Sequence, residues 1–355
     1  MRPKIDDVVM ENNSESESSR SGSSGALSRP AGVRESRKQF NLAAVRKAPD
    51  FAAGAGDNGE NLDPLLDLEV LLRQTWNICG VSTLFNFQCE NEVVLKQYAK
   101  KLREQVACML SQEDVSYEAK VSVLELERPN SDDHPIIKIN VTAKVATKGD
   151  RETMVYSGYL ISWGNENVEN SFTDNATKLP LLLCRGTPNT MKAVHATLSR
   201  LFDCIIVTLP ANSEDLAWLL PIIISPGCGQ DSAKDADEAS LEYRIPNLPT
   251  SESITIKFQI KNLQNLLKSF LSNEDEINAH EVHKFHEIIQ HQILEVSSLQ
   301  LGLCILHRIS LPCVTISGSK MKVTNVQAMN AVLTYLNEKA MDALHCHVAQ
   351  LSICK

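Results

Sequence analysis

The sequence predicts an α+β protein: two lobes of mostly antiparallel sheet with packed helices, preceded by a disordered N-terminal tail. Apolar residues recur at helical spacing in some segments and at every second position in others, which predicts both helices and strands. These segments do not follow the regular strand–helix–strand alternation of a doubly wound sheet. The beginning of the chain is rich in Ser, Gly, Asn and charge and has no hydrophobic period, which is typical of disorder.

The expected tail, residues 1–61, carries two features that suit binding. Ser alternates with Glu in the segment NNSESESSRSGSSG, which favours acid-directed phosphorylation, although a purely solubilising role explains the composition equally well. A small basic island follows and includes Arg37 and Lys38. Because a disordered basic arm can contact phosphates, we expect these two residues to face DNA, with nuclear import or no specific role as alternatives.

The N-terminal lobe is expected over residues 62–226 and begins with a helix. Asp63 is a favourable N-cap, and Pro64 suits the first helical position. Apolar residues continue at helical spacing as far as Trp76. The first helix should therefore end at Gly80, where the pattern stops.

A second helix is expected over residues 92–110, after a short strand at 83–87. Its apolar residues share one face, which should be buried. They are Leu95, Ala99, Leu102, Val106 and Met109. Lys96, Lys100 and Arg103 share another face, which is either a solvated stripe or a ridge facing DNA.

Three consecutive strands should form an antiparallel meander. Segments 116–127 and 136–145 alternate apolar and polar residues, and segment 153–163 is more continuously apolar. The turns between them have the length and composition of hairpin turns. The rest of the lobe should contain strands at 179–184 and 204–209, a helix at 188–202 capped by Thr187, and a helix at 214–224 capped by Asn212 or Ser213.

A polar loop at residues 227–239 is the best internal boundary, and the C-terminal lobe is expected over residues 240–355. The expected elements of that lobe are strands at 241–246, 254–260, 299–309, 313–317 and 320–323, and helices at 261–271, 277–296 and 325–344. The buried stripes of the last two helices should be Val282, Phe285, Ile289, Ile293 and Val296, and then Met329, Leu333, Leu336, Ala340 and Leu344.

The sequence contains no pattern that predicts catalysis. There is no phosphate-binding glycine loop, nucleophile elbow or zinc-protease motif. His280, His283 and His286 are three residues apart on one helix and diverge around it, so they cannot converge on one metal ion. We therefore expect a chain that is not an enzyme and has no cofactor or metal. The alternative is a soluble α+β enzyme whose site is assembled from dispersed residues.

The ten cysteines include no Cys-x-x-Cys pair, and several lie in apolar runs, which favours free thiols in a reducing compartment. The apolar run at 216–224 is too short to span a bilayer. No secretory signal is visible at the beginning of the sequence. We expect a cytosolic or nuclear protein that binds neither a membrane nor a small-molecule substrate.

Several strings resemble the centromere protein L family in their order along the chain. They are Arg37-Lys38-Gln39, Trp76 with the segment TLFNF at 83–87, Tyr156-Ser157-Gly158-Tyr159, Leu179-Pro180-Leu181, Leu201-Phe202-Asp203-Cys204, Leu216-Ala217-Trp218, Lys320-Met321-Lys322-Val323 and Ala331-Val332-Leu333-Thr334-Tyr335-Leu336. The resemblance runs from about Arg34 to Ala340. The acidic Ser-rich leader and the C-terminal segment ALHCHVAQLSICK depart from it.

The resemblance implies a non-catalytic subunit of the inner kinetochore that supports chromosome segregation in mitosis, with a location in the nucleus at the centromere. It also implies a heterodimer with centromere protein N through the C-terminal halves of both chains, further inner-kinetochore partners, and DNA or nucleosome contact within the complex. An edge strand can be completed by another chain. We therefore expect Lys320, Met321, Lys322 and Val323 to form such an edge strand and to bind the partner.

Overall fold

The computed structural model describes residues 37, 39–46, 64–124, 133–146, 152–164, 175–228, 237–249, 252–273 and 275–353, without the side chains of 64–67 and 345–353. Most of the expected tail, including Lys38, lies outside the described residues. Residues 229–236 of the expected boundary loop also lie outside them. The division of the chain into two lobes at this loop stays a prediction.

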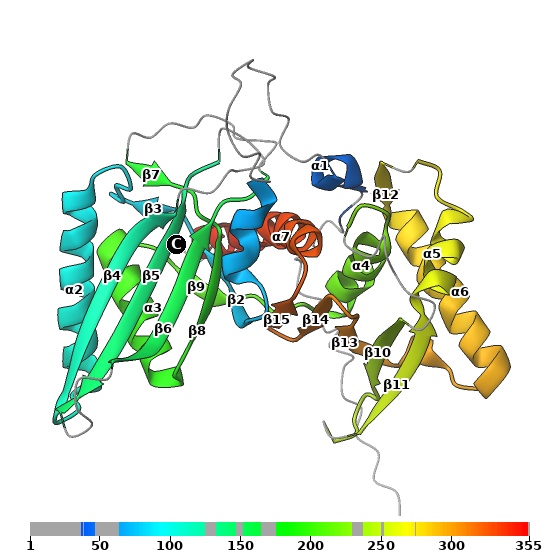
Figure 1. Ribbon diagram of the computed structural model, residues 1–355. Helices are drawn as coiled ribbons and strands as arrows, with labels where there is room; N and C mark the ends of the chain where they lie inside the picture. The colour runs from blue at the N-terminus through cyan, green and yellow to red at the C-terminus, as the bar shows by residue number, and fades with distance from the viewer. Residues whose placement is uncertain are drawn as a thin grey trace, which may run out of the picture. The chain divides into compact units, whose positions relative to one another are not determined.

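The main sheet is antiparallel and has 11 strands (Figure 1). Its strands are β2 (Thr75–Val81), β4 (Val115–Leu124), β5 (Ile136–Val145), β6 (Glu152–Ile161), β8 (Leu181–Gly186), β9 (Ile206–Thr208), β10 (Glu238–Arg244), β11 (Ser253–Gln259), β13 (Ile305–Ser310), β14 (Val314–Ser317) and β15 (Lys320–Val323). The spatial order is β11-β10-β13-β14-β15-β2-β8-β6-β5-β4, and β9 pairs with β2. This sheet and its helices confirm the predicted α+β class, and the meander is β4-β5-β6.

Two further sheets have two strands each. In one, β1 (Gln39–Asn41) pairs with β12 (Glu276–Asn278), and in the other β3 (Leu84–Phe85) pairs with β7 (Ala176–Thr177). The α-helices are α1 (Leu42–Arg46), α2 (Glu92–Leu110), α3 (Pro188–Phe202), α4 (Ser213–Ile224), α5 (Ile260–Lys268), α6 (Ala279–Ser297) and α7 (Val326–Ile353). Short 3₁₀ helices lie at η1 (Pro64–Leu71) and η3 (Leu301–Leu303).

The helices begin where a side chain can accept hydrogen bonds from the first turn. Asn91 accepts from the N–H groups of Val93 and Val94, and Thr187 accepts from the N–H of Thr190. Asn212 and Asn278 each form a capping box with the acidic residue three positions later. These caps explain why most helix starts are predictable from the sequence.

The sheet is buried on both faces around β8. Leu181 and Leu183 belong to a core that includes residues of α4 and α7, whereas Leu182 and Cys184 belong to a second core with α2 and α3. A strand buried on both faces reads as a continuous apolar run rather than an alternating one. This is why the segment LLLC carries no polar residue.

The first predicted helix is wrong beyond Leu71. The 3₁₀ helix η1 ends there, Arg73 has a left-handed φ of 61°, and the chain turns into strand β2. Trp76 is buried within this strand, and its Nε1–H donates to the carbonyl oxygen of Leu71 over 2.8 Å. Residues of β2 alternate between the two cores. Of the apolar residues whose spacing predicted a helix, only Trp76 lies in this strand.

The expectation that order begins at Asp63 is also wrong. Strand β1 and helix α1 lie earlier in the chain, and Phe40, Leu42 and Val45 are buried. The side-chain amide of Asn330 on α7 donates to the carbonyl oxygen of Val45 over 2.8 Å and accepts a hydrogen bond from the Trp163 indole over 2.8 Å. A short segment without hydrophobic periodicity is thus fixed by long-range contacts.

Three smaller differences concern residues at the ends of elements. Val296, expected in the core, is 87% exposed, and Met109 is also exposed. Strand β13 begins at Ile305 rather than at 299, because η3 comes before it. Helix α7 continues beyond Leu344 to Ile353.

Candidate partner-binding surfaces

The strand predicted to lie at a sheet edge lies inside the sheet, so this prediction is wrong. β15 pairs with β14 on one side and with β2 on the other, so that Met321 lies opposite both Ile316 and Trp76. Met321 and Val323 are 1% and 0% exposed, while Lys320 and Lys322 are exposed. Pairing with β2 joins segments more than 240 residues apart, and local sequence patterns do not encode such a partner. Partner contact through the two lysines stays a prediction.

Arg37 is held within the fold and does not face outward, which contradicts the expectation that it faces DNA. Its guanidinium group forms an ion pair with Glu338 and lies 4.2 Å from the ring centroid of Tyr335. Only 13% of its side chain is exposed. A guanidinium packed on aromatic rings and paired with a carboxylate anchors a segment. Arg37 thus fastens the segment at the beginning of the described residues to α7.

One end of the main sheet is strand β11. Its residues alternate, with Ile254, Ile256 and Phe258 half-buried and the residues between them exposed. β11 pairs with β10 on one side only. Along its other side, alternate residues present backbone N–H and C=O groups that no strand of the described residues pairs with.

An exposed apolar segment lies beside this end of the sheet. Five large apolar side chains of residues 294–305 are exposed, and we call them the apolar segment. They are Leu294, Val296, Leu299, Leu303 and Ile305. Ile305 of β13 lies opposite Arg244 of β10, and Arg244 lies opposite Ser253 of β11. The last residue of the apolar segment is therefore two strands away from the β11 edge. Single exposed apolar residues are ordinary, but such a group marks an interaction surface.

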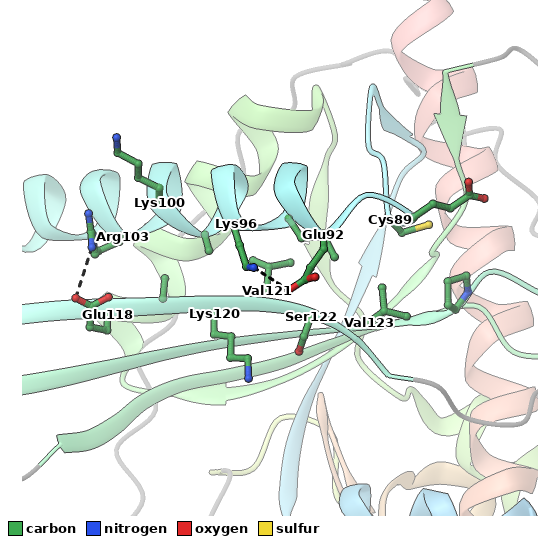
Figure 2. A pocket seen from close by; sticks show the side chains of 15 residues that line it. Cys89, Glu92, Lys96, Lys100, Arg103, Glu118, Lys120, Val121, Ser122 and Val123 are labelled. Carbon is green, nitrogen blue, oxygen red and sulfur yellow. Dashed lines mark ion pairs between the residues drawn. The ribbon is translucent and has the colours of Figure 1, made fainter.

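The other end of the main sheet is β4, which lies beside α2 (Figure 2). Helix and strand enclose a groove of about 770 Å³. Lys96 pairs with Glu92 over 2.8 Å, and Arg103 pairs with Glu118 over 3.5 Å. The hydrogen bond from Lys96 lowers the pKa of Glu92. Lys96, Lys100 and Arg103 therefore line a groove, and their contact with DNA stays a prediction.

The described residues contain no group of three or more His, Cys, Asp or Glu side chains that could hold a metal ion. On α6, His286 is buried, its Nε2 lies 2.9 Å from the carbonyl oxygen of Ala217, and burial lowers its pKa. Further along the same helix, His291 lies beside Glu295, with 3.5 Å between its Nδ1 and the carboxylate.

Two of the buried thiols, those of Cys184 and Cys204, are held in their protonated form, whereas a hydrogen bond with Cys184 lowers the pKa of Cys79. A hydrogen bond with Cys79 and burial raise the pKa of Cys184, and burial raises the pKa of Cys204 to about 11. The thiolate is the reactive form of cysteine, so raised pKa values make these thiols poor nucleophiles. Burial also lowers the pKa of His195 to about 4, which keeps its imidazole neutral.

A buried polar cluster joins α4 to α7. Asp215 forms an ion pair with Lys339 and accepts a hydrogen bond from the Tyr335 hydroxyl over 3.1 Å. Burial, followed by the charge of Asp215, raises the pKa of Tyr335. Asp215 also closes the capping box at the start of α4, where it accepts from the N–H of Asn212 over 2.7 Å. The partners of the Asp215 carboxylate therefore serve to start α4 and to join it to α7.

No helix among the described residues is both long and apolar enough to cross a bilayer.

The family model for centromere protein L matches residues 70–341. Centromere protein L of Gallus gallus is 26% identical over 239 residues, which cover 65% of this chain and 67% of that protein. Centromere protein L of Xenopus tropicalis is 24% identical over 80% of this chain and 82% of its own length. For the Homo sapiens protein the identity is 21%, over 79% and 83% of the two chains.

Proposed function

This chain belongs to the centromere protein L family, and we propose that it is a non-catalytic structural subunit of the inner kinetochore that forms a heterodimer with centromere protein N. The family match over residues 70–341 is the observation that carries the proposal. As a subunit of this kind the chain resides in the nucleus at the centromere of the chromosome. It holds kinetochore subunits together on centromeric chromatin during chromosome segregation.

Two features support a binding role over the alternative of an enzyme with a dispersed site. The thiols of Cys184 and Cys204 are kept protonated, and the buried imidazoles of His195 and His286 are kept neutral inside the core. By contrast, large apolar side chains and a sheet edge are exposed in the second half of the chain. Such exposure suits a surface that another protein covers.

We place the contact with centromere protein N on β11 and the apolar segment. A strand of the partner added to β11 would pair with the free backbone groups of this edge and continue the sheet. The apolar segment would supply the buried centre of the interface, since its last residue, Ile305, lies in register with Arg244 of β10 and Ser253 of β11. A stable heterodimer buries roughly 1,600 Å² or more.

Paired substitution of Val296→Asp and Leu303→Asp tests this interface. Both side chains are exposed, at 87% and 68%, so the charges should leave the fold unchanged and remove co-purification with centromere protein N. Val93→Asp is the matched control, because Val93 is 63% exposed on the distant helix α2. Undiminished co-purification of the double variant, with the melting temperature of the parent chain, would place the interface elsewhere.

Affinity purification from dividing cells tests the wider role. Kinetochore subunits should accompany the tagged chain in stoichiometric amounts, and the tagged chain should mark centromeres by microscopy. Recovery of the chain without them would contradict the proposal.

Contact of Lys96, Lys100 and Arg103 with DNA or nucleosomes within the complex is a second candidate role for the groove between α2 and β4, and it competes with the peptide site proposed below. Phosphate contacts make binding salt-dependent. Charge reversal of these residues should therefore reduce the salt dependence of chromatin binding.

A further inference from the structure

We propose that the groove between α2 and β4 binds an extended peptide of another protein, in which apolar and acidic residues alternate, as a strand added to β4. This surface lies at the opposite end of the sheet from the one assigned to centromere protein N. The proposal does not depend on that assignment. It rests on the main chain of β4, on the apolar lining under α2, and on the cations around the groove.

The main chain of β4 is a long, regular sheet edge. Its ten residues pair with β5 without interruption, from Val115 opposite Val145 to Leu124 opposite Ile136. On its other side no strand of the described residues pairs with it. Alternate residues of such an edge present unpaired N–H and C=O groups, which are a template for an incoming strand. Ten residues give an added strand a full set of main-chain hydrogen bonds.

Beside this edge, α2 and β4 provide an apolar lining. Ala119, Val121 and Val123 lie two residues apart on one face of β4, pack against the second core and stay half-exposed. Leu95 and Ala99 of α2 line the same groove. A strand beside β4 would direct every second side chain into this lining, because side chains alternate between the faces of a sheet. Peptide-binding domains that use strand addition combine a free edge with such pockets for alternate side chains.

The charges around the groove favour an acidic partner. Glu92 and Glu118 are already paired with Lys96 and Arg103. Lys100 and Lys120 line the groove and have no ion-pair partner within the part of the chain that the structure describes. Figure 2 shows Lys120 and Ser122 on the side of β4 away from α2. The side chains of an added strand that point away from α2 would lie beside Lys120. Acidic residues at those positions would form ion pairs with its ammonium group.

Edge protection and binding of duplex DNA each use only part of this arrangement. An edge lysine such as Lys120 protects sheets from aggregation, but protection does not require a groove of about 770 Å³ with half-exposed valines. Duplex DNA would use the cations, yet two of the four are already paired with carboxylates and the apolar lining offers nothing to phosphates. An alternating acidic peptide uses the edge, the lining and the free cations together.

Selection from three pools of ten-residue peptides on the immobilised full chain tests the proposal. The first pool alternates Val, Ile or Leu with Asp or Glu. The second replaces the acids by Lys, and the third contains the composition of the first in separate apolar and acidic blocks. We expect the first pool to be enriched about tenfold over the other two, with slower hydrogen exchange in β4 on binding.

Variants then locate the site. Paired reversal of Lys100→Glu and Lys120→Glu should weaken binding of the enriched peptides about tenfold, and Ala99→Phe should block the groove without changing charge. Lys101→Glu with Lys192→Glu is the matched control, since both lysines are exposed and neither lines the groove. Equal enrichment of the block pool, no loss in the first variants, or tighter and equally charge-dependent binding of a 20-base-pair DNA duplex would each overturn the proposal, the last in favour of nucleic acid.

Discussion

Lys339 and Asp215 form an ion pair in the interior, with side chains 9% and 11% exposed. Burying two charges is costly, and their attraction offsets the cost only while both are present. The carboxylate also closes the α4 capping box and accepts from Tyr335. The loss of either residue should therefore destabilise the packing of both α4 and α7, the helices that the pair joins.

Replacement of Lys339 by Met should lower the free energy of unfolding by about 3–5 kcal/mol, because it leaves the Asp215 charge buried without its cation. The double variant Lys339→Met with Asp215→Asn should recover part of that loss, since no unpaired charge remains. Urea unfolding measures both. Lys101→Met, at an exposed lysine of α2, is the control, and an equally small effect at both positions would show that the buried pair contributes little.

His195 gives the chain a pH-dependent stability. Its folded pKa of about 4 lies below the ordinary value of 6.5, because burial disfavours the charged imidazole. As pH falls below 6.5 the unfolded chain takes up this proton and the folded chain does not, so stability decreases until the folded pKa is reached. Between pH 6.5 and 5 this single group should cost roughly 2 kcal/mol.

Urea midpoints measured from pH 7 to pH 5 test this effect in the parent chain and in His195→Gln. The variant should show a flatter dependence on pH, while His291→Gln, at an exposed position on α6, should follow the parent chain. Identical slopes for the parent chain and His195→Gln would show that His195 does not stay neutral in the folded state.

At the scale of elements, the segment β1–α1 shows how a stretch of weak local signal becomes ordered. Phe40 is 2% exposed, β1 pairs with β12, and Asn330 of α7 binds the carbonyl oxygen of Val45. All these partners lie more than 200 residues away in the sequence. The basic residues that resemble a DNA-binding arm instead include Arg37, which fastens this segment to α7.

Phe40→Ala should lower the free energy of unfolding by about 3 kcal/mol, because it removes a buried ring. It should also increase hydrogen exchange in α1, since the ring holds this segment against the core. Phe85→Ala is the matched control at a ring that is 44% exposed. Unchanged exchange in α1 would mean that β1 and Arg37 hold the segment without the ring.

The elements that the sequence predicts correctly are those with a local cause. Asn91, Thr187 and Asn212 cap their helices, and β4, β5 and β6 follow the period of two between hairpin turns. The turn before β15 is also local, because Gly318 takes a left-handed φ of 54° between paired Ser317 and Lys320.

The predictions from the sequence are wrong where tertiary contacts determine whether a segment is a helix or a strand, or whether a residue is buried. Trp76 belongs to a strand because β2 lies between β8 and β15, and β15 is an interior strand for the same reason. Val296 follows the apolar stripe of α6 but extends past the core, so its exposure could not be predicted from spacing. Spacing also misses the apolar segment as a surface, because Val296 continues the apolar stripe of the helix and Leu299, Leu303 and Ile305 fall in the strand expected over 299–309.

At the scale of the whole described chain, one sheet has two ends with different surfaces. β11 adjoins the apolar segment, and β4 adjoins the groove with its free lysines. Partners at the two ends would not compete for residues, so one chain could bind both at once. This arrangement suits a subunit whose role is to connect other proteins.

Mixing the purified chain with centromere protein N and measuring the molar mass of the product by light scattering tests the central claim most directly. We expect a single species with the summed mass of one copy of each chain, which the paired variant Val296→Asp and Leu303→Asp fails to form. Separate elution of the two folded proteins at micromolar concentration would contradict the proposed heterodimer.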